Sequence, residues 1–456
     1  MRLRNVWLCA LFPVLAPAEG AFAQARENVG DPEPPLASSS APASPLWVQP
    51  LALLLNNGPL VTHTGVCPSN TDASRVQNTS LGLSTIGANV SLSGGFRIAD
   101  DFTVPAGGWY LNTVTFFSYQ TGSTLTSTFN HVNFRIWNGP PNVGTSTVVF
   151  GDTSTNRFAS TAFSGIYRDT ETTTCAVAGG QTRPIMTING NAGVLLAPGT
   201  YWLDWQLGGT LTSGPWQPPV TILGQPGKPG ANGLQFNPGT SSWQNFEDSG
   251  TGTPRQDAPF VLDGEACTMS VPPNQTVPAS ATACSATVTF SPTIGPAVCA
   301  GGGITTSCTP ASGSSFPLGT TTVNCSSNFG HSGSFQVTVV DQTPPTLTCP
   351  ATQNVVSMGG APVPVSYTVP ATDNCTASLS VLCTPPSGSL FPVGSHTVTC
   401  RATDQAGNQG SCSFQVNVTL GLPTARQIPA AGLWALGGLG GLLGLLGWRA
   451  LRRRAA

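Results

Sequence analysis

Two stretches that lie 75 residues apart decide the fold of this chain: Gly313-Ser-Ser-Phe-Pro-Leu-Gly319 and Gly388-Ser-Leu-Phe-Pro-Val-Gly394. In each stretch proline and glycine favour a turn, and one phenylalanine, Phe316 or Phe391, stands beside that turn where it can fill a core. Alternation of apolar and polar residues follows directly, which is the pattern of a half-buried strand. The two stretches therefore predict a repeated β-structural unit.

The cysteines repeat with the same offset. Cys308 and Cys325 are 17 residues apart, and so are Cys383 and Cys400. Each copy also ends on an alternating strand. About seven short strands in roughly 75 residues predict an immunoglobulin-like sandwich for each copy. The copies are placed at residues 266–342 and 343–419.

The second copy resembles a hyalin repeat (HYR) domain over its whole length. The matching segments are Pro344-Pro345, Cys349-Pro350, Ala371-Thr-Asp-Asn-Cys375, Pro386 to Gly394, Thr403-Asp-Gln-Ala-Gly-Asn408 and Cys412. The first copy is a degenerate relative, because it lacks the Asp-Gln-Ala-Gly-Asn turn and a counterpart of Cys412. The resemblance implies extracellular, immunoglobulin-like packing linked with adhesion or with the spacing of other domains, and it implies no chemistry.

Asp373, Asp404 and Asn408 are oxygen-bearing residues of the kind that calcium prefers. Each stands in a turn-type sequence, where Asp and Asn are expected for conformational reasons. We therefore predict no metal site and no cofactor, and calcium binding at these residues is the less favoured alternative that the sequence leaves open.

Residues 51–265 have strand-like runs divided by Pro, Gly and Asn clusters, and they predict a jelly-roll-like β-sandwich. The stretch resembles an uncharacterised domain of exported bacterial proteins that carry sorting tails, on the residues 99–105, 199–202 and 213–219. That resemblance implies no biochemical role. Period-two alternation puts Tyr201, Leu203 and Trp205 on one face of a strand and Trp202 on the other. We therefore name Trp202, and Trp216 in a Pro-rich loop, as candidate rings for stacking on a glycan.

Composition excludes some classes of partner. Charged residues make up only 8% of the chain and the formal net charge is −2, while Gly (53) and Pro (41) are abundant. Long helices are disfavoured by this composition. No clustered basic face is visible, so nucleic acid is not an expected partner.

The N-terminus has the pattern of a secretory leader. Residues 1–23 combine Arg2 and Arg4, a short apolar core and the small-x-small pattern Ala21-Phe-Ala23. Residues 24–50 are rich in Pro, Ser and Ala, and we expect a disordered linker there.

After a linker at 420–427, residues 428–456 combine a long uncharged apolar run with a terminal arginine cluster. The run from Ile428 to Trp448 predicts one C-terminal transmembrane helix through an inner membrane, with the body of the protein outside. Ile428-Pro429 with Trp434 resembles the IPTL-CTERM sorting signal of Gram-negative bacteria, although Ala430 and Ala431 replace its usual Thr and Leu. The resemblance implies cleavage near Ile428 by an exosortase-type protease and delivery to the cell envelope. A plain single-pass anchor is the open alternative.

Thirteen cysteines are present, and Cys9 lies in the leader. The spacing lacks the CxxC pairs of metal sites, so disulfides of an oxidising compartment are expected. The expected pairs are Cys308 with Cys325, Cys383 with Cys400, Cys349 with Cys412, Cys284 with Cys299, and Cys67 with Cys175. Cys267 and Cys375 are left over.

Recognisable catalytic motifs are lacking in the sequence. A two-carboxylate glycosidase would have to draw on a small pool of acids in the first domain: Asp100, Asp101, Asp204, Glu247 and Asp248. The favoured interpretation is an exported, cell-surface, non-catalytic adhesion or matrix module. Carbohydrate binding by residues 51–265 is the alternative hypothesis, and hydrolysis of an extracellular polymer is the third.

Overall fold

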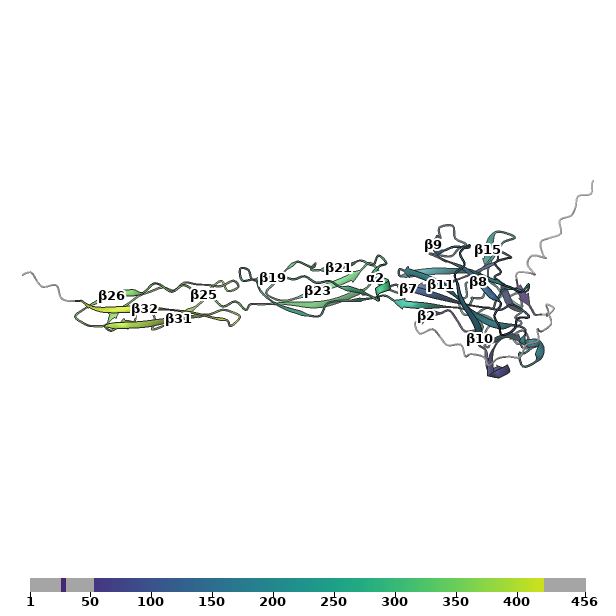
Figure 1. Ribbon diagram of the computed structural model, residues 1–456, viewed down its shortest axis with the longest axis horizontal. Coiled ribbons are helices and arrows are strands. Elements are labelled where there is room, and N and C mark those ends of the chain that lie inside the picture. The colour runs from purple at the N-terminus through teal and green to yellow at the C-terminus, as the bar shows by residue number, and fades with distance from the viewer. Residues whose placement is uncertain (1–25, 30–52, 422–456) are drawn as a thin grey trace, which may run out of the picture. The chain divides into compact units, whose positions relative to one another are not determined.

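The structure is a computed structural model that describes residues 26–29 and 53–421 (Figure 1). Two compact units are defined by the contacts. One holds the chain up to Pro273 with Phe290–Ser312 and Val323–Phe335, and the other holds Asn274–Thr289, Gly313–Thr322 and the residues from Gln336 onward. Within the described residues, regular structure is almost entirely β, and the helical elements there are the single turns η1 (Pro68–Asn70), η2 (Ala178–Gln181) and α2 (Ala297–Ala300).

The predicted fold class needs a correction, because it included a transmembrane helix. Across residues 26–29 and 53–421, none of the helices has the length and apolarity needed to cross a membrane. The leader at 1–23 and the apolar run from 428 to 448 lie outside the described residues. Residues 420 and 421, expected in a linker, are the end of the last strand.

A large β-sandwich forms the body of the first unit. One sheet has the order β2 (Leu53–Asn56), β16 (Phe260–Ala266), β7 (Trp109–Ser118), β11 (Pro184–Leu196), β10 (Phe158–Thr170), β4 (Thr71–Val76) and β3 (His63–Cys67). The facing sheet has the order β15 (Ser242–Asn245), β14 (Leu234–Asn237), β6 (Arg97–Val104), β12 (Gly199–Gly209), β8 (Phe129–Trp137) and β9 (Val148–Gly151). A third sheet contains β1 (Arg26–Asn28), β5 (Thr85–Asn89) and β13 (Trp216–Gln217).

Aromatic side chains join the two large sheets. Phe116 of β7 packs on Trp205 of β12 with ring centroids 5.3 Å apart, and Trp205 in turn contacts Phe260 of β16 at 6.0 Å. All three rings are fully buried. Trp205 thus lies on the core face, as the alternation predicted.

The sequence predicted a jelly-roll-like sandwich, and the observed sandwich is larger than a jelly roll, which has eight strands. Its sheets have seven and six strands, and β4 pairs with β10 in parallel. The expectation of a jelly roll is therefore corrected to a larger mixed sandwich with a third, small sheet.

Residues 26–28 also depart from the expectation of a disordered linker, because they form β1 against β5. Glu27 is buried there. Its carboxylate accepts hydrogen bonds from the Tyr119 hydroxyl at 2.7 Å, the Thr121 hydroxyl at 2.7 Å and the Arg183 guanidinium at 3.0 Å. Tyr119, Thr121 and Arg183 lie far from Glu27 in the sequence, so the composition of residues 24–50 could not predict these hydrogen bonds.

The two repeats share one strand order. In the first, a four-stranded sheet runs β18 (Gln275–Pro278), β24 (Ser332–Val340), β23 (Gly319–Ser327) and β21 (Thr306–Thr309), with the pairs β17 (Thr268–Ser270) to β20 (Thr293–Gly295) and β19 (Ser285–Thr287) to β22 (Ser315–Pro317). In the second, it runs β26 (Gln353–Met358), β32 (Gln409–Gly421), β31 (Gly394–Thr403) and β29 (Val381–Thr384), with the pairs β25 (Thr346–Leu347) to β28 (Ala371–Thr372) and β27 (Val363–Pro364) to β30 (Leu390–Phe391). The first pair of each four-stranded sheet is parallel.

The phenylalanines of the two deciding stretches occupy the predicted core positions. Phe316 is fully buried, and Phe391 is 2% exposed in a cluster with Val398, Phe414 and Val416. The small size of this cluster makes each of its rings important to the domain.

We expect Phe391→Ala to destabilise the second repeat by about 3–5 kcal/mol, because it removes a buried ring and leaves a cavity. The matched control is Leu390→Ala, since Leu390 precedes Phe391 and is 66% exposed. The measurement is the urea dependence of hydrogen exchange in β31 and β32 of the full chain. Equal losses for the two variants would contradict the assignment of Phe391 to the core.

Candidate functional site

Six disulfides link the described cysteines. They join Cys67 to Cys175, Cys267 to Cys299, Cys284 to Cys375, Cys308 to Cys325, Cys349 to Cys412 and Cys383 to Cys400. The prediction that Cys284 pairs with Cys299 is wrong. The antiparallel pairing of β17 with β20 and the α2 turn bring Cys299 to Cys267 instead. So many disulfides fit an exported protein.

Three of these loops overlap in sequence. The loop closed by Cys267 and Cys299 overlaps the loop from Cys284 to Cys375, and that loop overlaps the one from Cys349 to Cys412. Every peptide bond between 267 and 412 therefore lies inside at least one covalent ring. A single break in the backbone between Cys267 and Cys412 leaves the two halves joined by at least one disulfide.

Trp202 does not form the exposed glycan platform that the sequence suggested. It faces away from Trp205, as predicted, but it is only 6% exposed, because Ala99, Leu234 and the rings of Trp137 and Trp243 surround it. The prediction assumed that one face of the strand was open to solvent, and this face is covered.

Trp216, the second candidate ring, is half-buried in β13. Its indole N–H donates to the Ser213 hydroxyl at 3.1 Å, and its ring packs against a cluster that includes Tyr119 and Ile86. The structure therefore does not bring Trp202 and Trp216 together in one binding surface.

The face that carries Trp202 also holds a buried ionic group. Asp204 accepts hydrogen bonds from Arg135 and from the Trp137 indole at 3.2 Å, and Arg97 lies 3.7 Å from its other oxygen. Arg97 stands over Trp243 at 5.1 Å, and Arg135 over Trp137 at 4.8 Å. Cation–π contacts thus cover one side of each ring, and Asp204 compensates the two arginines.

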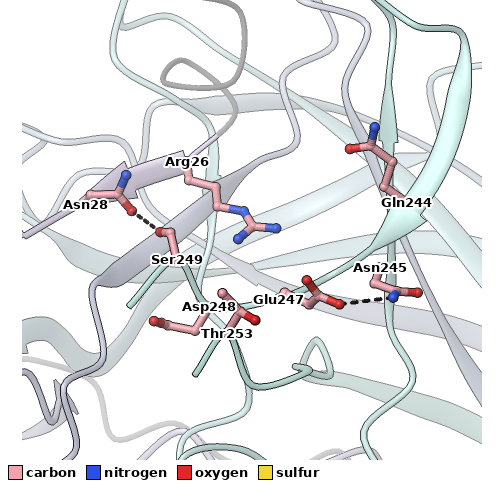
Figure 2. Close-up of a pocket in the computed structure, with 8 residues that line it drawn as sticks. All are labelled: Arg26, Asn28, Gln244, Asn245, Glu247, Asp248, Ser249 and Thr253. Atoms are coloured by element: carbon pink, nitrogen blue, oxygen red, sulfur yellow. Dashed lines mark hydrogen bonds between the residues drawn. The ribbon is translucent and has the colours of Figure 1, made fainter. Parts of the chain in front are cut away.

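An open pocket of about 650 Å³ lies between β1 and the segment that follows β15. All the side chains that line it are polar: Arg26, Asn28, Gln244, Asn245, Glu247, Asp248, Ser249 and Thr253. Figure 2 shows Arg26 projecting from β1 into the space beside Glu247, whose carboxylate accepts a hydrogen bond from the Asn245 amide at 3.0 Å.

The two adjacent acids of the pocket have different roles. Asp248 is 2% exposed, and its carboxylate accepts backbone N–H groups of Ser84, Thr85 and Gly250 at 2.7–3.0 Å. These bonds attach the pocket loop to the start of β5. Glu247 is only half-buried and remains open to a ligand.

Arg26 is the cation of the pocket. Burial lowers the pKa of its guanidinium below the ordinary value, and the negative charges of Asp248 and Glu247 oppose that shift. The pocket thus presents a fixed cation, a carboxylate and several amides, which suits a ligand rich in hydroxyl groups.

Candidate catalytic residues are dispersed in the described part of the chain. The rings of His63, His131 and His396 bond to Thr62, Asn133 and the Pro392 carbonyl, respectively. His331 contacts the Ser327 hydroxyl at 2.8 Å, but that hydroxyl also accepts backbone N–H groups of its own turn. Asp100 is buried and accepts the Asn57 amide and the Ala258 N–H.

One group of metal-ligand type, Cys67, Asp169 and Cys175, is also accounted for. Its sulfurs form a disulfide, and Asp169 pairs with Arg75 at 2.7 Å, so these atoms are not available to an ion. The predicted sorting residues Ile428, Pro429 and Trp434 lie outside the described residues.

One protein-family model matches part of this chain. The model of the HYR domain matches residues 340–418, so this segment of the chain is a HYR domain. Hyalin of Strongylocentrotus purpuratus is 37% identical over 120 residues, which cover 24% of this chain and 10% of that hyalin. Hyalin of Lytechinus variegatus is 38% identical over 116 residues, which cover 23% of this chain and 22% of that hyalin. The chain thus spans less than a quarter of either relative.

Solved structures match only weakly. Human CDH23 EC21-23 is similar over 33% of this chain and 70% of its own, with 15% identity and a TM-score of 0.17. The fibronectin(III)-like modules of Clostridium thermocellum CbhA are similar over 34% of this chain and 94% of their own, with 14% identity and a TM-score of 0.14. Scores this low support no inference about this chain. The resemblances of the first domain and of the tail stay predictions.

We expect Asp248→Asn to destabilise the pocket loop by about 2–4 kcal/mol, because buried hydrogen bonds to a charged acceptor are lost or weakened. Glu247→Gln is the matched control in the adjacent position and should change stability by less than about 0.5 kcal/mol. Hydrogen exchange of residues 82–89 and 246–253 in the full chain measures both. A larger effect of Glu247→Gln would reverse the roles given to these two acids.

Proposed function

We propose that this protein is an exported, non-catalytic structural or adhesion module of the cell surface or extracellular matrix. Its two repeats act as a spacer, and its first domain carries the ligand-binding surface. The HYR domain at 340–418 and the disulfides support this proposal. Residues 266–421 contain Arg401 but no lysine, and trypsin-like proteases, which cleave after Lys or Arg, therefore have one site there.

The observation that carries the proposal is the overlap of the three disulfide loops. The shortest covalent path from Cys267 to Cys412 runs through three S–S bonds and two backbone segments, Cys284 to Cys299 and Cys349 to Cys375. That path contains about 41 residues instead of about 145, so its full extension is about 140 Å rather than about 500 Å. A spacer outside the cell benefits from such a limit, because it resists both tension and single cleavages.

The direct experiment is limited proteolysis of the oxidised full chain. We expect chains cut between 267 and 412 to keep their full mass before reduction and to separate into fragments after it. In the double variant Cys284→Ser, Cys375→Ser, a cut between 326 and 348 should release fragments without reduction.

Alkylation of intact cells supplies the control for export. A thiol reagent that crosses membranes should find none of the twelve cysteines of the body free. Free thiols, or release of fragments from the unreduced wild type, would refute the proposed spacer.

A second candidate function is carbohydrate binding by the first domain, and the pocket of Figure 2 favours it. Its volume of about 650 Å³ falls within the range of ligand sites, roughly 300–1,000 Å³. The lining residues Arg26, Asn245 and Glu247 supply both donors and acceptors for sugar hydroxyl groups. The candidate site therefore differs from the one predicted from the sequence, because neither Trp202 nor Trp216 lines the pocket.

We expect the full chain to bind a saccharide on a glycan array, and Glu247→Gln and Asn245→Ala to weaken binding by about tenfold or more. Loss of a hydrogen bond to a charged group accounts for this factor. Asn191→Ala, on the exposed side of β11, is the control that should leave binding unchanged. A silent array, or equal binding by all variants, would remove this candidate.

A further inference from the structure

The two repeats contain very few charged residues, so the positions of their few acids need an explanation. Between residues 266 and 421 the acidic residues are Asp341, Asp373 and Asp404, and the one Lys or Arg is Arg401. They lie in the segments that follow β24, β28 and β31, respectively. All three acids fall within the HYR domain match.

The fold brings these three acids together. One oxygen from each carboxylate lies within 4.8 Å of the other two, and Asp341 and Asp404 are buried. Oxygens bound to one calcium ion at about 2.3–2.6 Å are at most about 5 Å apart. The spacing of the three carboxylates therefore equals that of ligands around one ion.

Turn formation accounts for both oxygens of Asp404, which accept the Asn408 backbone N–H at 2.7 Å and the Asn408 amide at 2.8 Å, but for only one oxygen each of Asp341 and Asp373. Asp373 accepts the N–H groups of Cys375 and Thr376 through Oδ2 at 2.9 and 2.8 Å, and Asp341 accepts Thr343 N–H through Oδ1 at 3.1 Å. The opposite oxygens, Oδ2 of Asp341 and Oδ1 of Asp373, are buried without a hydrogen-bond partner. Asp341 as a whole is only 8% exposed.

The neighbouring Asn374 also has a buried oxygen without a hydrogen-bond partner, although its side chain is neutral. Its amide nitrogen donates to the Ser280 carbonyl at 2.9 Å, and its Oδ1 is buried without a partner. Buried polar atoms are nearly always paired. The unpaired oxygens of Asp341, Asp373 and the adjacent Asn374 are therefore acceptors that a bound cation would satisfy.

No charge of opposite sign compensates the cluster. Among residues 26–29 and 53–421, none of the three carboxylates forms an ion pair with a lysine, arginine or histidine, and Arg401 is exposed. Like charges this close to one another repel. A bound cation removes this repulsion and satisfies the unpaired oxygens at once.

We propose that Asp341, Asp373 and Asp404, with the Asn374 amide oxygen, form a binding site for one divalent cation, and that the ion is calcium. All the proposed ligand atoms are oxygens, whereas zinc prefers thiolate sulfur and imidazole nitrogen ligands. Calcium accepts six to eight oxygen ligands in flexible geometry and completes its shell with water. The site joins the turns after β24, β28 and β31, so the ion ties the end of the first repeat to the second.

The test is calcium binding to the oxidised full chain after treatment with a chelator. Titration calorimetry with CaCl₂ should give one ion per chain, with a Kd of about 10⁻⁴–10⁻³ M as in other extracellular modules. Asp341→Asn and Asp373→Asn should weaken binding by more than about tenfold, because loss even of an outer-shell partner has an effect of that size. Asp101→Asn, which changes the net charge equally in the first domain, should have no effect.

Folding of the variants is checked independently of calcium. Asparagine keeps the shape and one acceptor oxygen of aspartate, so the turns should form, and hydrogen exchange of β31 and β32 without calcium should match the wild type. Addition of calcium should slow exchange in residues 341–347 and 373–376 of the wild type only. Absence of binding at 10 mM CaCl₂ (about ten times the expected Kd), equal binding by the Asp variants, or equal affinity for Mg²⁺ would overturn the proposal.

Discussion

The covalent cross-links of the repeats are the constraint on which the rest of this protein depends. Each repeat buries one phenylalanine beside a turn, Phe316 or Phe391, and in the second repeat Phe391 belongs to a narrow core of a few valines and Phe414. Domains of about 75 residues bury too little apolar surface for large stability. Disulfides limit the entropy of the unfolded chain, and a loop as long as that from Cys284 to Cys375 contributes about 4–5 kcal/mol in the chain-entropy model. The sandwich folds can therefore persist with few apolar residues and almost no charges.

The first domain is stabilised in a different way from the two repeats. It is large enough to enclose aromatic layers around Trp205, and it pairs several of its buried acids with arginines. Glu27 meets Arg183 at 3.0 Å, and Asp169 meets Arg75 at 2.7 Å. In such pairs the partner and the surrounding hydrogen bonds offset the loss of hydration. The three acids of the HYR domain form no such pair among the described residues, and they also converge on one another, which is the basis of the proposed cation site.

Much of the repeats could be read from the sequence, because their signals are local. Phe316 and Phe391 stand next to the prolines and glycines that bend the chain, and Cys308 and Cys325 face each other across one antiparallel ladder. The pairing of Cys284 with Cys375 has no local signal, since its two ends belong to different repeats. For the same reason Asp341 did not enter the candidate metal ligands: it lies 32 residues before Asp373, and only the strand order places it beside that turn.

The β class, the repeated unit with its buried phenylalanines, the HYR resemblance and the alternation that separates Trp205 from Trp202 are all visible in the amino-acid sequence. These features follow from spacing over a few residues, where backbone geometry leaves little choice. Three other features became visible in the folded protein alone: the face of Trp202 is covered, Asp248 holds a loop while Glu247 faces a pocket, and three distant aspartates converge. Such properties depend on which strands become neighbours, and that choice is made by the packing of the whole domain.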